Sequence, residues 1–154
     1  MTEGRLDATI MVAYLHKANG RTSFAGRHCE SRPHTDTNRR NGGSHCTAVD
    51  IAYTPSDLLR LKNAGKKAIM LGIENGYAIG KALSRLRHFR DRGIVYMTLC
   101  HNGDNDICDS ARGKGEHGGL SAFGREVVQE MNRLGLMVDL SHGAESSFYD
   151  CAGT

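Results

Sequence analysis

Short apolar runs and longer stretches of mixed polarity alternate in a regular order along most of this chain. Residues 68–73 form a continuous apolar run, which is typical of a strand buried on both faces. Similar runs follow at residues 94–100 and 136–140, and an earlier one spans residues 6–15. Each of these runs is short enough for a strand, so the pattern predicts a strand at each position.

The stretches between and after these runs carry apolar residues at helical spacing. They predict helices over residues 54–64, 83–92, 121–134 and 144–151. Thr54 and Ser121 each supply a capping hydroxyl at the start of a helix. Three of the helices are followed by glycines that can adopt the left-handed conformation, namely Gly65, Gly93 and Gly135.

Strands that alternate with helices at this spacing predict right-handed crossovers and a parallel sheet. We therefore expect an α/β fold in a single domain, because 154 residues suit one hydrophobic core. From the residues alone, an open α/β sheet and part of a (β/α)₈ barrel both remain compatible with the pattern.

Composition and charge narrow the functional classes. The chain is 39% hydrophobic and 24% charged, which argues against a disordered tail and against a membrane protein. No apolar run approaches the roughly 20 residues needed to span a bilayer, and residues 1–17 show no signal peptide. The compartment therefore stays unknown. The net charge is +3, and the sequence shows no basic face with interleaved aromatic residues. We therefore expect no nucleic-acid partner.

Residues 16–47 differ from the rest of the chain. They are rich in polar residues and almost free of periodic apolar positions, which predicts an irregular loop or a disordered segment. The pairs His28-Cys29 and His45-Cys46 suggest a zinc site as an alternative, although their spacing matches no zinc-finger pattern. The five cysteines include no CxxC motif, and reduced thiols are expected.

Three predicted strands are directly followed by residues that can bind metals. Glu74, His101 and His142 occupy these positions. Because the carboxyl ends of parallel strands lie at the same edge of a sheet, we expect these side chains to lie close together. One carboxylate and two imidazoles suit zinc or a similar divalent ion, and a carboxylate can also bridge two metals.

Other polar residues are weaker candidates. Asp104, Asp106 and Asp109 faintly resemble a calcium loop, but the glycine and distal glutamate of an EF-hand are missing, so we expect turn formation instead. His117 lies in a glycine-rich loop. Asp139 lies within an apolar strand and needs a polar partner if it is buried.

Four segments carry a family resemblance. Residues 72–76 (GIENG), 96–102 (YMTLCHN), 118–128 (GGLSAFGREVV) and 132–142 (NRLGLMVDLSH) together resemble the membrane (renal) dipeptidase family of metallopeptidases. The order and the gaps both fit, and the resemblance extends over roughly residues 50–150. It is weaker over residues 4–15, which look like the second barrel strand of the family.

The resemblance implies a metal-dependent hydrolase fold, a (β/α)₈ barrel with two zinc ions at its carboxyl-terminal rim. It implies that Glu74 bridges both metals, that His142 is a ligand of one metal, and that His101 is a catalytic residue that contacts the substrate and supports the developing oxyanion. The implied reaction is hydrolysis of a dipeptide by zinc-activated water, including dipeptides with a D-residue at the second position.

The chain also departs from the family. The His-x-Asp ligand pair of the first strand is missing before Leu6, and His34-Thr-Asp36 lies in the wrong place. Asn75 follows Glu74 where many relatives have glycine, and residues 18–47 do not resemble the family. A further histidine ligand and an acidic catalytic residue belong to later strands.

We therefore expect an incomplete barrel of about strands two to five, as a single partial domain over residues 1–154. Half of the ligand set is missing, so weak or no activity of the isolated chain is expected. Unpaired sheet edges suggest self-association. The alternative is a non-catalytic α/β fragment that binds metal weakly or mediates an interaction, or a barrel piece that binds phosphate.

Overall fold

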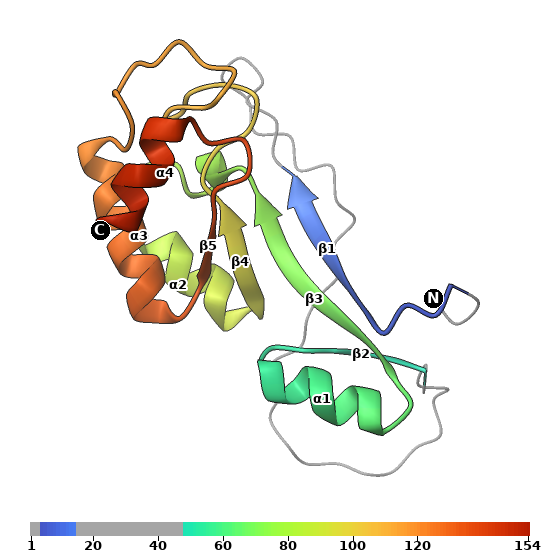
Figure 1. The fold of residues 1–154 in the computed structure, drawn as a ribbon. Coiled ribbons are helices and arrows are strands. Elements are labelled where there is room, and N and C mark those ends of the chain that lie inside the picture. Colours follow the sequence, from blue (N-terminus) through green and yellow to red (C-terminus); the bar gives the residue numbers. More distant parts are fainter. Residues whose placement is uncertain (1–3, 15–47) are drawn as a thin grey trace.

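The fold is an α/β arrangement built on a parallel sheet (Figure 1). The computed structural model describes residues 4–14 and 48–154, and the statements below concern these residues. The elements, in chain order, are β1 (Ala8–Tyr14), β2 (Val49–Ile51), α1 (Pro55–Asn63), β3 (Lys67–Glu74), η1 (Gly76–Ile79), α2 (Ser84–Asp91), β4 (Ile94–Thr98), α3 (Ala122–Leu134), β5 (Met137–Asp139) and α4 (Glu145–Ala152).

Local capping explains where the helices begin and end. The Thr54 side chain accepts a hydrogen bond from the Asp57 backbone, and the Asp57 side chain bonds back to the Thr54 backbone, which completes a capping box for α1. Ser121 caps α3 in a similar way through the Gly124 backbone. Gly135 ends α3 in the left-handed conformation, with φ of 66°. These caps confirm the predicted helix boundaries.

The strands pair in parallel in the order β1-β3-β4-β5. Ala68 and Ile69 pair with both β1 and β2, so these two strands lie on opposite edges of β3. The four predicted strands are confirmed, with somewhat shorter bounds for β4 and β5. Strand β2 and the 3₁₀ helix η1 were not predicted, because each is too short to show a periodic pattern.

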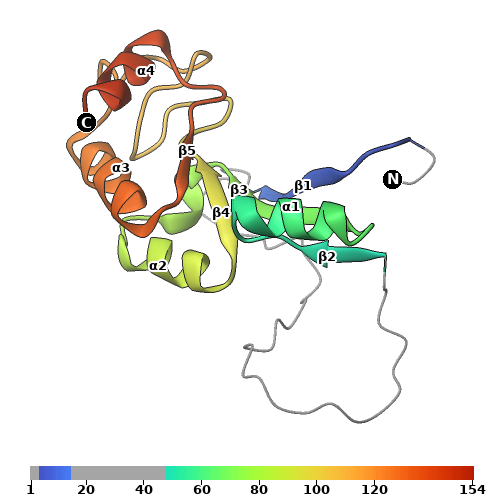
Figure 2. The ribbon, with the colours of Figure 1, turned by 60° about the horizontal axis from the view of Figure 1, so that its bottom comes forward.

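One face of the sheet packs against α2 and α3, which lie side by side on it (Figures 1 and 2). The core at this face is fully buried and joins strand residues to helix residues. Ile73, Met97 and Leu99 contribute from the strands and the segment after them, and Val127 and Met131 contribute from α3. This packing fixes the carboxyl ends of β3 and β4 relative to each other.

The opposite face carries the functional candidates, and we call it the site face, defined by Gly72, Glu74, Tyr96, Thr98 and Asp139. The pairing of Gly72 with Tyr96 and of Thr98 with Asp139 places these side chains in rows across the sheet. Helix α1 packs against the amino-terminal end of this face, far from Glu74 (Figure 1). The carboxyl end of the site face is therefore left for the candidate metal ligands.

Part of the site face is apolar and exposed. Ile10 and Val12 of β1 are 47% and 44% exposed, and Met137 of β5 is 55% exposed. Within the described residues, β1 and β5 each have one edge without a paired strand.

No helix in the described part of the chain is both long and apolar enough to cross a membrane. The predicted irregular segment, residues 16–47, lies outside the described residues, as do the candidate zinc ligands His28, Cys29, His45 and Cys46.

Candidate metal centre

Glu74, His101 and His142 come together at the carboxyl end of the sheet, as the sequence predicts. One potential ligand atom from each residue lies within 4.8 Å of the others. The Glu74 Oε1 atom is 3.4 Å from His101 Nε2 and 3.6 Å from His142 Nε2. The two imidazole rings are 4.3 Å apart at their centroids. The three side chains are partly exposed, so the cluster is open to a ligand.

The position of each residue is set by the carboxyl end of a strand. Glu74 is the last residue of β3, while His101 and His142 each lie three residues beyond the last residue of β4 and β5. His142 has a φ of 68°, a left-handed conformation that is uncommon outside glycine. Backbone strain of this kind is concentrated at functional sites.

Asn75 also has a positive φ, of 82°. Asparagine tolerates such conformations better than most residues. Its side chain accepts hydrogen bonds from the Tyr77 backbone and from Asn105 Nδ2, at 3.2 Å each. Asn75 therefore forms this turn with a positive φ, and its side chain links the turn to the loop that contains Asn105.

Asp139 supports the segment that carries His142. Its carboxylate accepts hydrogen bonds from Thr98 Oγ1 at 2.6 Å and from the backbone and side chain of Ser141. Burial alone raises the pKa of Asp139, but these hydrogen bonds outweigh that effect and lower the pKa overall. The predicted polar partner of this strand carboxylate is thus Thr98, together with Ser141.

Ser110 connects the two histidines through their backbones. Its hydroxyl lies within hydrogen-bond distance of the carbonyl oxygens of both His101 and His142. The Ala111 amide also donates to the His142 carbonyl oxygen, at 2.8 Å. The loop after β4 therefore holds His101 and His142 in a fixed relation.

Two buried carboxylates stabilise that loop. Asp104 accepts backbone hydrogen bonds from Ser110, Lys114 and Gly115. Burial raises the pKa of Asp104, but these amide donors outweigh it and lower the pKa overall. Asp109 accepts from the backbones of His117 and Gly119. Asp104 and Asp109 therefore stabilise the turns of this loop through backbone hydrogen bonds.

The donor set fits a zinc ion. Zinc binds imidazole nitrogen and carboxylate oxygen at about 2.0–2.2 Å, so neighbouring ligands of a tetrahedral site lie roughly 3.4 Å apart. The distance from Glu74 Oε1 to His142 Nε2, 3.6 Å, is close to that spacing. The other histidines of the described residues lie elsewhere: His88 pairs with Arg92, and His117 Nε2 contacts the Asn105 carbonyl oxygen.

Tyr14 was missed by the sequence reasoning. Its hydroxyl lies 3.2 Å from His101 Nδ1, and it is paired in register with Glu74. The signal was present in the sequence, because Tyr14 ends the first strand as Glu74 ends the third. Ser110 gave no such signal, since its position depends on how the long loop folds back.

A family model, curated proteins and solved structures match this chain. The family model described as membrane dipeptidase (peptidase family M19) matches residues 1–153. The dipeptidase tcpJ of Claviceps purpurea is 33% identical over 97% of this chain, and the match covers 37% of that protein. The chain therefore spans little more than a third of the length of this relative.

Two solved structures show the same fold. The probable dipeptidase PvdM of Pseudomonas aeruginosa matches 70% of this chain and 28% of its own, with a TM-score of 0.67 and 33% identity. A metallopeptidase of Rhodobacter sphaeroides, liganded with a phosphinate mimic of the dipeptide L-Ala-D-Ala, matches 70% of this chain and 32% of its own, with a TM-score of 0.63 and 26% identity.

These matches confirm the predicted fold class, because the parallel sheet corresponds to part of a (β/α)₈ barrel of the metal-dependent hydrolase type. The family match extends over almost the whole length of the chain. The chain belongs to the membrane dipeptidase family, peptidase family M19, and covers part of its domain.

Proposed function

We propose that this chain carries part of the active site of a zinc-dependent dipeptidase. The observation that supports this most directly is the approach of His101 Nε2 and His142 Nε2 to the same carboxylate oxygen of Glu74, at 3.4 and 3.6 Å. Family membership supports peptide hydrolysis as the reaction. The dipeptide mimic bound by the Rhodobacter sphaeroides relative supports dipeptides as the substrate class.

Each of the three residues has a proposed role. Glu74 and His142 would hold zinc as ligands, and Glu74 would be the ligand shared by the two zinc ions of a complete family site. His101 is the catalytic residue that donates a hydrogen bond to the substrate carbonyl oxygen as negative charge develops there. Zinc, when bound, supplies a water molecule whose pKa is lowered toward neutrality.

The surrounding residues of the chain keep this arrangement in place. Thr98 and Ser141 hold the Asp139 carboxylate, which lies at the base of the turn that presents His142. Ser110 links the backbone carbonyls of the two histidines. Such outer contacts orient ligands, and their loss typically costs about 10–100-fold in metal affinity.

Zinc titration of the full chain by calorimetry tests the ligand assignment. We expect Glu74→Gln and His142→Asn to weaken zinc binding by more than about tenfold. Removing a ligand should lower the zinc affinity at least as much as removing the hydrogen bonds that orient that ligand. His101→Asn should bind zinc nearly as tightly as the unmodified chain. His88→Asn is the matched control, because His88 is exposed on α2 and pairs with Arg92.

Unchanged zinc affinity in Glu74→Gln would contradict the proposed site. Weak binding that none of the three substitutions alters would favour the non-catalytic alternative. The same chain, loaded with zinc and given the dipeptide L-Ala-D-Ala, is expected to hydrolyse it weakly or not at all. The reason is that the chain spans little more than a third of the length of a curated relative, so it holds only part of the family domain. A rate equal to that of a complete family member would contradict this expectation.

We also propose that the free edges of β1 and β5 favour self-association. A strand edge presents unpaired backbone donors and acceptors, which invite pairing with another strand. The exposed apolar side chains of Ile10, Val12 and Met137 lie next to these edges and add surface that prefers burial.

A further inference from the structure

Tyr14 approaches the candidate site from β1, a strand that contributes no metal ligand. Its hydroxyl lies 3.2 Å from His101 Nδ1, and the two rings are 4.7 Å apart with an angle of 57° between their planes. The register of β1 against β3 places Tyr14 beside Glu74. Tyr14 therefore contacts the nitrogen of His101 that points away from Glu74.

The two nitrogens of His101 face groups of different kinds. Nε2 faces the Glu74 carboxylate at 3.4 Å, and an ionised carboxylate offers only acceptors, so a proton on Nε2 is favoured. A neutral imidazole that carries its proton on Nε2 has an acceptor at Nδ1. The Tyr14 hydroxyl, 3.2 Å from Nδ1, can donate to that acceptor.

We propose that Tyr14 is a positioning residue that holds His101 in the tautomer with its proton on Nε2. This inference rests on the proposed function, and it deepens it. The tautomer makes Nε2 a hydrogen-bond donor, which suits a developing oxyanion, and it removes the lone pair that a metal ion would need. The hydrogen bond from Tyr14 thereby favours His101 as a hydrogen-bond donor and disfavours it as a metal ligand.

His142 provides the contrast. Its Nε2 also faces Glu74 Oε1, at 3.6 Å, but within the described residues no hydrogen bond is made by its ring. His142 is therefore free to carry its proton on Nδ1 and to present an unprotonated Nε2 to a metal ion. Two histidines at the same carboxylate can thus take different roles, and the hydroxyl of Tyr14 accounts for the difference.

The tautomer can be measured by ¹⁵N nuclear magnetic resonance of the imidazole side chains in the metal-free full chain, at pH ~8, where imidazoles are ordinarily neutral. In the unmodified chain we expect a protonated Nε2 of His101 and an unprotonated Nδ1 whose shift is that of a hydrogen-bond acceptor. Tyr14→Phe keeps the ring contact but removes the hydroxyl. The Nδ1 signal should then move to the position of a free acceptor, and the fraction of the Nε2-protonated form should fall.

Tyr149→Phe is the matched control, because Tyr149 is 65% exposed on α4 and should leave the His101 signals unchanged. A His101 that is protonated on Nδ1 in the unmodified chain would overturn the inference without any substitution. Identical His101 spectra in Tyr14→Phe would also overturn it. The zinc titrations of Glu74→Gln are independent of this readout, so failure of the proposed metal site and failure of the Tyr14 inference are distinguishable.

Discussion

Gly72 lies two residues before Glu74 on β3 and packs directly against the Tyr96 ring. A Cβ atom at Gly72 would lie 1.9 Å from Tyr96 Cε1, so no larger residue fits unless the ring moves. Burial raises the pKa of Tyr96, and the nearby charges of Asp139 and Glu74 add to the effect. The phenol therefore stays neutral as it covers the backbone beside the candidate ligand.

We expect Gly72→Ala to lower the free energy of unfolding by about 1–3 kcal/mol, because overpacking displaces the Tyr96 ring. Urea denaturation measures this loss. The matched control is Gly103→Ala, because no atom lies within 4 Å of the added Cβ there. Equal denaturation midpoints for the two variants would contradict the close packing of Gly72 and Tyr96.

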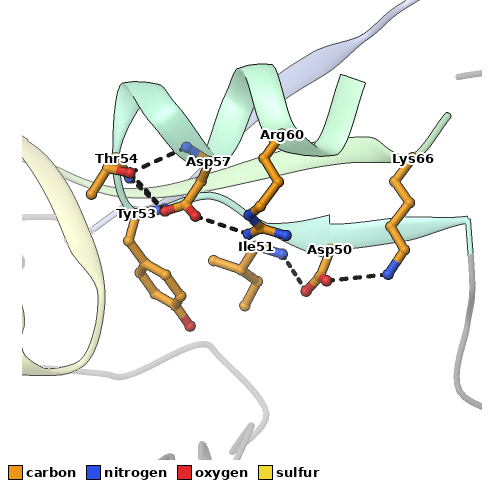
Figure 3. A network of polar contacts seen from close by, with 7 residues as sticks. All are labelled: Asp50, Ile51, Tyr53, Thr54, Asp57, Arg60 and Lys66. Atoms are coloured by element: carbon orange, nitrogen blue, oxygen red, sulfur yellow. Dashed lines mark hydrogen bonds and ion pairs between the residues drawn. The ribbon is translucent and has the colours of Figure 1, made fainter. Parts of the chain in front are cut away.

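At the scale of elements, α1 depends on a network of charged and polar side chains at its start (Figure 3). Arg60 Nη2 donates to Asp57 Oδ1 at 2.8 Å, and Thr54 Oγ1 donates to Asp57 Oδ2 at 2.8 Å. These hydrogen bonds, first from Arg60 and then from Thr54, lower the pKa of Asp57 from 3.8 to about 2. The ionised carboxylate is thus the form that stabilises the helix.

Because the pKa of Asp57 is lowered in the folded chain, its stabilising effect is present above pH 3.8 and is lost as the pH falls toward about 2. We expect Asp57→Asn to have lower stability than the unmodified chain at neutral pH and to lose this difference near pH 2. Thermal unfolding followed by circular dichroism at several pH values tests this. Asp91→Asn, on the exposed end of α2, is the control. A stability difference independent of pH would contradict the assigned role.

Some elements of the fold could be predicted from the sequence, and others could not. The start of α1 at Thr54 and the end of α3 at Gly135 were predictable, because capping depends on neighbouring residues. Strand β2 has three residues and pairs with the start of β3, so it is defined by tertiary contacts and leaves no periodic signal. The 3₁₀ helix η1 depends on Asn75, whose side chain accepts a hydrogen bond from the Tyr77 backbone.

The candidate site also contains residues that the sequence could predict and residues that it could not. Glu74, His101 and His142 were predictable because each lies at or just beyond the carboxyl end of a strand, and parallel strands bring such residues to one edge. Ser110 was not predictable, because its contacts with the carbonyls of both histidines depend on the path of a long loop. Tyr14 was overlooked because an aromatic residue at a strand end more often belongs to a core.

At the scale of the whole molecule, the described sheet has the shape of a barrel segment with two open sides. Strands β1 and β5 lie at its ends, and both have exposed apolar residues. The relatives of known structure are about three times as long as the matched part of this chain, since the match covers 28% and 32% of two of them. Apolar surface that faces solvent here corresponds to barrel interior or to helix contacts in a complete barrel.

We expect the chain to form concentration-dependent oligomers, because within residues 4–14 and 48–154 these edges have no paired strand and these side chains are exposed. Met11→Lys places a charge on β1, where Met11 is 56% exposed, and should shift the chain toward the monomer. Leu59→Lys is the matched control, because Leu59 is 66% exposed on helix α1 and lies on no strand edge. Size-exclusion chromatography with light scattering gives the mass. A monomer at every concentration would contradict the expected self-association.

The carboxylates of Asp104 and Asp109 each gather several backbone amides of one long loop, which contains no helix and only isolated bridges. Amide protons held in this way exchange with solvent only when the loop opens, so hydrogen exchange at Ser110 and Gly119 should be as slow as in regular secondary structure. The loop then opens as one cooperative unit. The lifetime of the arrangement of His101 and His142 is therefore set by the rate of that single opening event, and not by the independent motion of each side chain.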